Sequence, residues 1–300
     1  MDANAAPVHS ASRQGDSFAP ADVCEALSTS PLAGDWKVWR ARSGWSHRTF
    51  VAFDGTRRIF LKFGVAVDAL RSLAELAVTP VVLHAGEYRG HSFVIQAFIA
   101  GRHPHHGWFG RHLAEMARLV GAYQGDARLR ALVSPTTTLT HTKLVTGVLD
   151  DLELRSRGGI TPPPQNARFV EAVGELRRLS TKLRATDLVP THGDPNPKNF
   201  ILTDQLYLVD WDDLALSSPL RDVAQLLWWY VPPYRWHEFF ELLGFEDGSH
   251  EFDDLYWWVA TESLDVAINV AERGDPERAG EFLADFAAAI EQRTNPHARW

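Results

Sequence analysis

The sequence predicts an α+β protein in two lobes, a small five-stranded antiparallel sheet with one helix and then a larger, mainly α-helical lobe. Three observations predict this. Apolar residues alternate over residues 36–63 and again over 78–101, the apolar period becomes helical beyond Gly101, and two short apolar runs flank a turn near residue 204. We place the first lobe at residues 20–100, the second at residues 101–300, and a flexible tail at residues 1–19.

The strands of the first lobe are separated by turn signals. Residues 36–63 contain Ser43-Gly44 and Asp54-Gly55, so they predict three antiparallel strands. Residues 66–77 return to a helical period and predict the single helix. Residues 78–101 then predict two further strands, joined by a turn near Arg89-Gly90.

The second lobe begins with three predicted helices, at residues 109–124, 143–156 and 166–185. They are followed by a hairpin whose short strands cover residues 200–203 and 206–209. Clustered polar residues flank this hairpin on both sides, so it is expected to carry a site at each end. The remainder of the chain to residue 300 has a helical pattern.

The composition favours a soluble globular protein over a membrane or secreted one. The chain of 300 residues is 45% hydrophobic and 23% charged, which is ordinary for a soluble globular protein. It contains no apolar run of about eighteen residues, and its first residues lack the basic start and apolar core of a secretory signal. We therefore expect no membrane contact and a cytoplasmic location. The lone Cys24 excludes an internal disulfide and fits a reducing compartment.

Charge is distributed unevenly along the chain. Residues 201–300 contain 20 Asp and Glu against 6 Lys and Arg, a balance of −14, whereas residues 1–200 contain 18 acidic against 24 basic residues. An acidic face disfavours nucleic acid as a partner, because phosphate binding needs positive charge. It suits a cationic ligand. The alternative is an acidic surface that serves only solubility.

Three polar residues surround the predicted hairpin in a spacing that suits phosphoryl transfer. Asp194 and Asn199 precede it in the run HGDPNPKN, and Asp210 follows its second strand in LYLVDWDD. Phosphoryl transfer needs an acceptor group that orients and deprotonates a hydroxyl, together with oxygen ligands that hold Mg²⁺. We assign the first role to Asp194 and the metal to Asn199 and Asp210. Each residue alone could instead serve a turn.

These runs resemble the aminoglycoside phosphotransferase and choline kinase-like family, which shares the bilobal protein-kinase fold. The first matching run comprises His192, Gly193, Asp194, Pro197, Asn199, Ile201 and Leu202, and the second comprises Val209, Asp210, Trp211, Asp212, Pro219 and Asp222. The resemblance implies an enzyme that transfers the γ-phosphoryl of Mg²⁺-bound ATP or GTP to an alcohol. It also implies that His192 and Asp222 brace the catalytic loop. Asn196 departs from the family, which commonly has His there.

The resemblance extends into the first lobe. By likeness to kinases, Lys62 on the third strand would bind the α- and β-phosphates, and Glu75 on the following helix would pair with it. Either residue could instead be a surface charge. The remaining implied nucleotide contacts are the turn residues Gly44 and Ser46 at the phosphates, Gln96 at the back of the pocket, and the backbone of Ala97 and Ile99 at the purine edge.

The acceptor is expected to lie among the helices after the hairpin. Aromatic clusters at residues 228–236 and 256–258 lie near carboxylates, and aromatic and acidic groups together make good walls for a cationic or sugar-like molecule. The alternative for these aromatic residues is core packing. We predict an amine-bearing small molecule, such as an aminoglycoside antibiotic or an amino alcohol, and the candidate substrate residues are Asp212, Asp213, Trp228, Glu238, Trp257 and Glu262.

Two other functions remain as alternatives. A protein kinase is disfavoured, because only eleven residues separate Asp210 from Asp222 and leave no room for an activation segment. An inactive nucleotide-binding regulatory protein of the same fold is disfavoured by the presence of Lys62, Asp194, Asn199 and Asp210 together.

Overall fold

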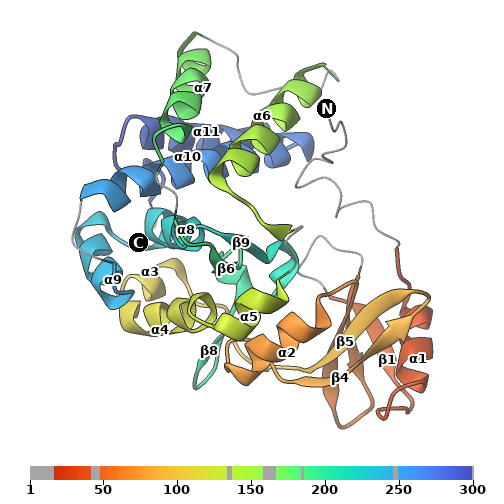
Figure 1. Cartoon of the computed structure of the whole chain (residues 1–300). Coiled ribbons are helices and arrows are strands. Elements are labelled where there is room, and N and C mark those ends of the chain that lie inside the picture. Colours follow the sequence, from red (N-terminus) through yellow and green to blue (C-terminus); the bar gives the residue numbers. More distant parts are fainter. Residues whose placement is uncertain are drawn as a thin grey trace.

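A computed structural model describes residues 17–41, 48–133, 137–157, 167–183, 186–245 and 249–298 of the chain. The chain folds into two lobes (Figure 1). The first, in red and orange, contains the sheet, and the second, in yellow to blue, is built mainly from helices. The expected α+β fold is confirmed.

The first lobe is an antiparallel sheet with strand order β1-β2-β3-β5-β4. Asp54 starts the turn between β2 and β3, where its carboxylate accepts hydrogen bonds from the N–H groups of Thr56 and Arg57. Gly55 in the same turn has a φ of 97°, which glycine adopts without strain. The strands are β1 (Lys37–Arg40), β2 (Thr49–Phe53), β3 (Arg58–Phe63), β4 (Val82–Tyr88) and β5 (His91–Ala97), with helix α2 (Val67–Glu75) between β3 and β4.

A second helix, α1 (Pro20–Ser28), corrects the expectation of one helix in this lobe. Pro20 occupies its first turn, and the Asp22 carboxylate accepts a hydrogen bond from the N–H of Ala19 at 2.7 Å, so both stabilise the helix start. Phe18 is buried and stacks on Phe63 at 4.0 Å between ring centroids. The expected flexible tail therefore does not reach residue 19, and its residues 1–16 lie outside the described residues.

The second lobe consists of helices and two small two-stranded antiparallel sheets. Strand β6 (Val189–Thr191) pairs with β9 (Ala215–Ser217), and β7 (Phe200–Leu202) pairs with β8 (Leu206–Leu208). None of the helices in the described part of the chain has both the length and the apolar character needed to cross a membrane. The helices are α3 (His106–Phe109), α4 (Leu113–Gln124), α5 (Ala127–Leu132), α6 (His141–Arg157), α7 (Ala167–Ser180), α8 (Leu220–Tyr230), α9 (Trp236–Leu242), α10 (Ser249–Glu272) and α11 (Pro276–Ile290).

The β7-β8 hairpin joins the two lobes through backbone hydrogen bonds. At the junction of the lobes, Arg102 lies five residues after β5 and exchanges two hydrogen bonds with Leu202 of β7, at 3.1 and 2.8 Å. Leu208 of β8 donates to the carbonyl of Val78, between α2 and β4, at 2.8 Å. Residues at the ends of this hairpin consequently face both lobes.

Candidate active site

The turn His192–Asp194, which we call the catalytic turn, follows β6 and is held by the first residues of α8. The buried carboxylate of Asp222 accepts hydrogen bonds from the N–H groups of His192 and Gly193 at 2.7 and 2.8 Å, and from the hydroxyl of Tyr123 at 2.7 Å. The side chain of Gln225 donates to the carbonyl of Gly193 at 2.9 Å. Gly193 has a φ of 89°, a conformation that favours glycine. Side chains of α8 thus fix the backbone of the catalytic turn.

The imidazole of His192 connects the catalytic turn to the end of β8. Its Nδ1 accepts from the N–H of Asp194 at 3.1 Å, and its Nε2 lies 2.9 Å from the carbonyl oxygen of Val209. The tautomer with a proton on Nε2 satisfies both contacts. The N–H of Val209 also donates to the carbonyl of Asn199 at 2.8 Å. These bonds hold Asp194, Asn199 and Asp210 close together.

The Asp194 carboxylate is exposed to solvent, although protein surrounds it on most sides. This partial desolvation raises the pKa of Asp194, and the negative charges of Asp213 and Asp210 act in the same direction. Asn196 donates to its Oδ1 at 2.8 Å and Asn199 to its Oδ2 at 3.2 Å. These two amides orient a carboxylate that can accept a proton.

Asp210 and Asn199 present oxygen atoms that suit Mg²⁺. The Nδ2 of Asn199 donates to the carbonyl of Asp194 at 2.9 Å, which directs its Oδ1 away from that bond. Asp210 follows β8 in the left-handed conformation, with a φ of 68° and a ψ of 57°, which is unusual for a residue other than glycine. Burial alone would raise the pKa of Asp210, but the charge and hydrogen bond of Lys62, together with the charges of His192 and Arg48, lower it. An ionised carboxylate and an amide oxygen are ligands of the kind that Mg²⁺ prefers.

Lys62 on β3 is buried, and its ammonium group contacts two carboxylates. Its Nζ lies 2.5 Å from Asp210 Oδ1 and 2.7 Å from Asp212 Oδ1. The expected pair between Lys62 and Glu75 is wrong: Glu75 is 60% exposed and pairs with Arg128 of α5. Because Glu75 is the last residue of α2, whose buried face is small or apolar, the helix offers no carboxylate to Lys62. Asp212, from the second lobe, fills that role.

The family of the chain follows from a comparison with known sequences. A sequence model of the phosphotransferase enzyme family matches residues 37–258, which run from β1 into α10 and include the whole site described above. The chain belongs to the phosphotransferase enzyme family. The expectation of a phosphotransferase of this family is confirmed.

Solved structures of low sequence identity share the fold of this phosphotransferase. A choline/ethanolamine kinase family protein from Mesorhizobium loti is 18% identical, with a TM-score of 0.65 over 91% of this chain and 99% of that one. The choline kinase LicA from Streptococcus pneumoniae is 15% identical, with a TM-score of 0.63 over 87% and 97% of the two chains. A spectinomycin phosphotransferase is 13% identical, with a TM-score of 0.62 over 92% and 98%. The expected bilobal fold is confirmed.

Gln96, Ala97 and Ile99, the predicted nucleotide contacts of the segment between the lobes, differ in the hydrogen bonds that they form. Gln96 is buried, and its amide group donates to the carbonyl of Pro80 at 2.8 Å. The N–H of Ala97 bonds within the sheet, to Val81, at 3.0 Å. The N–H of Ile99 has no acceptor among the described residues. The predicted phosphate contacts Gly44 and Ser46 lie outside the described residues.

Three of the six predicted substrate residues are buried in the protein interior, which corrects that assignment. Trp228 and Trp257 are 0% and 1% exposed and pack in the core of the second lobe, where aromatic side chains bury the most surface. The indole N–H of Trp257 donates to the carbonyl of Leu176. Glu262 is buried and pairs with Arg221 at 3.1 Å. None of the three can form a wall open to an acceptor.

The other three predicted substrate residues remain accessible to different extents. Asp212 is committed to Lys62 and also lies 3.7 Å from Arg48. Glu238 pairs with Arg235 on the surface and is 48% exposed. Asp213 lies close enough to Asp194 for its charge to raise the pKa of that base.

Several residues that hold the site carried no role in the sequence prediction. The side chain of Asn196 accepts a hydrogen bond from the N–H of Lys198 at 2.9 Å and so forms a turn. Asn-Pro sequences favour such a turn, so Asn196 could have been found from the sequence. Tyr123, Gln225 and Arg221 had no such signal. They lie on helices whose sequence pattern specifies a buried face but not the partner that a polar side chain meets there.

Proposed function

We propose that the protein is a small-molecule kinase that transfers the γ-phosphoryl group of a Mg²⁺-bound nucleoside triphosphate, ATP or GTP, to a hydroxyl group. The observation that supports this most is the convergence of Lys62, Asp194, Asn199 and Asp210 at the β7-β8 hairpin between the lobes. Neighbours in fold include a spectinomycin phosphotransferase in complex with ADP and spectinomycin, and a choline kinase.

In the proposed reaction, Asp194 accepts a hydrogen bond from the acceptor hydroxyl and takes its proton as the oxygen attacks the γ-phosphorus. The bond from the γ-phosphorus to the oxygen that bridges the β- and γ-phosphates breaks, and the nucleoside diphosphate leaves with that oxygen. Its raised pKa brings its basicity nearer to neutral pH, where proton transfer in both directions is efficient. Asn196 and Asn199 orient the carboxylate. Lys62 places a positive charge against the nucleotide phosphates. Bound Mg²⁺, held by Asn199 and Asp210, would supply further positive charge against the phosphates.

The nucleotide base is proposed to bind the segment that follows β5. Ala97 uses its N–H within the sheet, which leaves its carbonyl as a possible acceptor at the purine edge, and the N–H of Ile99 is a donor that no described residue engages. A donor and an acceptor two residues apart suit the edge of either purine. This backbone arrangement does not distinguish ATP from GTP, so the proposal includes both.

The alternatives fit the structure less well. The eleven residues between Asp210 and Asp222 contain a short 3₁₀ turn, Trp211–Asp213, and strand β9, which pairs with β6. They therefore form part of the core of the lobe and leave no segment to dock a polypeptide. An inactive nucleotide-binding protein would not need the oriented base that Asn196 and Asn199 provide.

We also propose that the acceptor carries an amine. The support for this is a single carboxylate near the proposed base, and not the acidic composition of residues 201–300 as a whole. Three of the four candidate substrate carboxylates, Glu262, Glu238 and Asp212, are paired with basic residues. Asp213 beside Asp194 is the carboxylate that supports the preference. Turnover of matched aminated and neutral hydroxyl compounds at low and high salt tests it. The aminated set should be faster, with KM rising as salt is added, and equal turnover of the neutral set would contradict the preference alone.

The kinase function itself is tested with a library of hydroxyl compounds and a readout of nucleotide consumption. The wild type should consume nucleotide with at least one compound, and Asp194→Asn should lower that turnover by at least ~10²-fold with nucleotide affinity nearly unchanged. An inactive regulatory protein would instead show a thermal shift with nucleotide and no turnover. Wild-type turnover in the Asp194→Asn variant would remove Asp194 as the base.

A further inference from the structure

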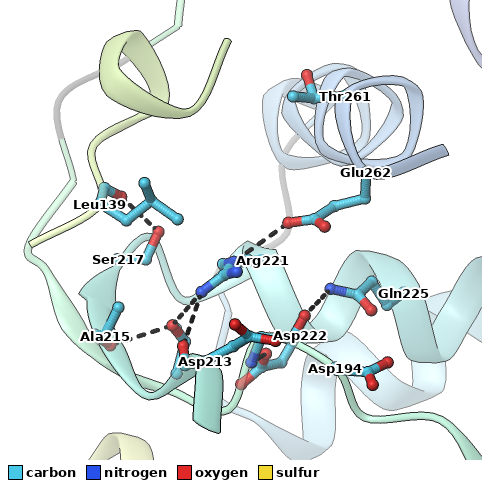
Figure 2. Close-up of polar contacts among 12 residues, drawn as sticks. Leu139, Asp194, Asp213, Ala215, Ser217, Arg221, Asp222, Gln225, Thr261 and Glu262 are labelled. Carbon is cyan, nitrogen blue, oxygen red and sulfur yellow. Dashed lines mark hydrogen bonds and ion pairs between the residues drawn. The ribbon is translucent and has the colours of Figure 1, made fainter. Parts of the chain in front are cut away.

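Arg221, the residue before Asp222, is buried directly beneath the catalytic turn. Its side chain is 1% exposed, and its Nε donates to Oε1 of Glu262 on α10 at 3.1 Å. Figure 2 shows the guanidinium group between Glu262 on one side and Asp213 on the other. An arginine in the first turn of a helix is usually exposed, so its burial needs a specific partner. Glu262 is that partner.

The guanidinium group also contacts two chain segments near the catalytic turn. Its Nη1 lies 3.4 Å from Oγ1 of Thr191, at the end of β6, and 3.4 Å from the carbonyl oxygen of Asp213. A Cβ atom at Gly193 would lie 2.8 Å from both terminal nitrogens. The absence of a side chain at Gly193 therefore lets Arg221 approach the backbone next to Asp194.

Stability alone gives little reason for such a pair. Removing two charges from water costs free energy that their attraction often fails to recover, and apolar residues of similar size can replace a buried pair without loss of stability. Here the pair contacts the turn that carries the proposed base and the carbonyl of Asp213, beside that base. The planar guanidinium group of Arg221 can donate hydrogen bonds in several fixed directions at once, which a lysine ammonium group cannot do.

We propose that Arg221, oriented by Glu262, is a positioning residue that fixes the catalytic turn relative to Asp213 and to helix α10. The proposal rests on the kinase function proposed above. Arg221 touches neither nucleotide nor acceptor and acts through the position of Gly193 and Asp194. A displacement of about 1 Å in a reacting group can lower turnover by up to about 10²-fold, so even a small shift of this turn is expected to be measurable.

The test compares kcat with stability in three variants of the full chain. Arg221→Lys keeps the charge and removes the planar donor, Glu262→Gln removes the charge that orients it, and Arg221→Met combined with Glu262→Leu replaces the pair by apolar residues. We expect kcat to fall about tenfold or more in each, with the Kd for nucleotide within about twofold of wild type. Arg155, which pairs with Asp151 and Glu272 between α6 and α10, gives a matched control. Arg155→Lys should alter Tm and leave kcat unchanged.

A purely structural role predicts a different result. The double apolar variant would then recover both Tm and kcat, and Arg221→Lys would lose activity only in proportion to the unfolded fraction; either result overturns the proposal. If the double variant does not fold, the two single variants decide, and wild-type kcat in folded Arg221→Lys or Glu262→Gln refutes the positioning role. Such a refutation leaves the kinase function intact, because that function fails only if the wild type itself has no turnover.

Discussion

Replacement of Asp222 by alanine should destabilise the protein more than any other single change at the site. Asp222 is fully buried, and its carboxylate accepts from the N–H groups of His192 and Gly193 and from the hydroxyl of Tyr123. Alanine leaves three buried donors without an acceptor. A buried donor without a partner costs ~1–3 kcal/mol, so a loss of ~3–9 kcal/mol is expected for the three donors. The total unfolding free energy of a folded protein is only ~5–15 kcal/mol.

Thermal unfolding followed by circular dichroism measures this loss. At about 2–4 °C per kcal/mol, Asp222→Ala should lower Tm by roughly 6–36 °C. Tyr123→Phe is the matched control, because it removes one donor together with its bond and should cost about 1 kcal/mol. The difference between the losses of stability in the two variants isolates the contribution of the backbone donors of the catalytic turn. A drop in Tm for Asp222→Ala no larger than that for Tyr123→Phe would refute the reasoning.

Three further outcomes are expected. Asp210→Ala should abolish the Mg²⁺ dependence of nucleotide binding in calorimetric titration, with Asn199→Ala weaker in the same direction, and an unchanged metal requirement would exclude Asp210 from the metal site. Glu75→Gln should leave turnover within about twofold of wild type, since its carboxylate faces away from the site, and a large loss would show that it reaches the nucleotide. The acid limb of kcat/KM should lie above the usual aspartate range, because the pKa of Asp194 is raised and the base is lost as pH falls through it. Asp213→Asn should move that limb to lower pH, and an unmoved limb would contradict the assignment.

The strands and the hairpin of this phosphotransferase could be predicted from sequence because their signals are local. Asp54-Gly55 and Arg89-Gly90 specify turns through the backbone conformations that these residues allow, and alternation of apolar residues specifies the faces of strands. The sequence prediction omits helix α1, although Pro20 and Asp22 mark its start. Local chemistry thus decided most of the first lobe.

The spacing of Asp194, Asn199 and Asp210 could likewise be read from sequence, since all three residues flank one hairpin whose turn brings its ends together. The sequence determined this part of the site. The sequence did not determine which charged residues pair when they are far apart in the chain. Residue type specifies what a side chain can bind, but it does not specify which side chain lies beside it. Lys62 meets Asp212 instead of Glu75, and Glu262 meets Arg221 instead of solvent. Trp228 and Trp257 become core for the same reason: only the packing of α8 and α10 decides which aromatic side chains lose contact with water.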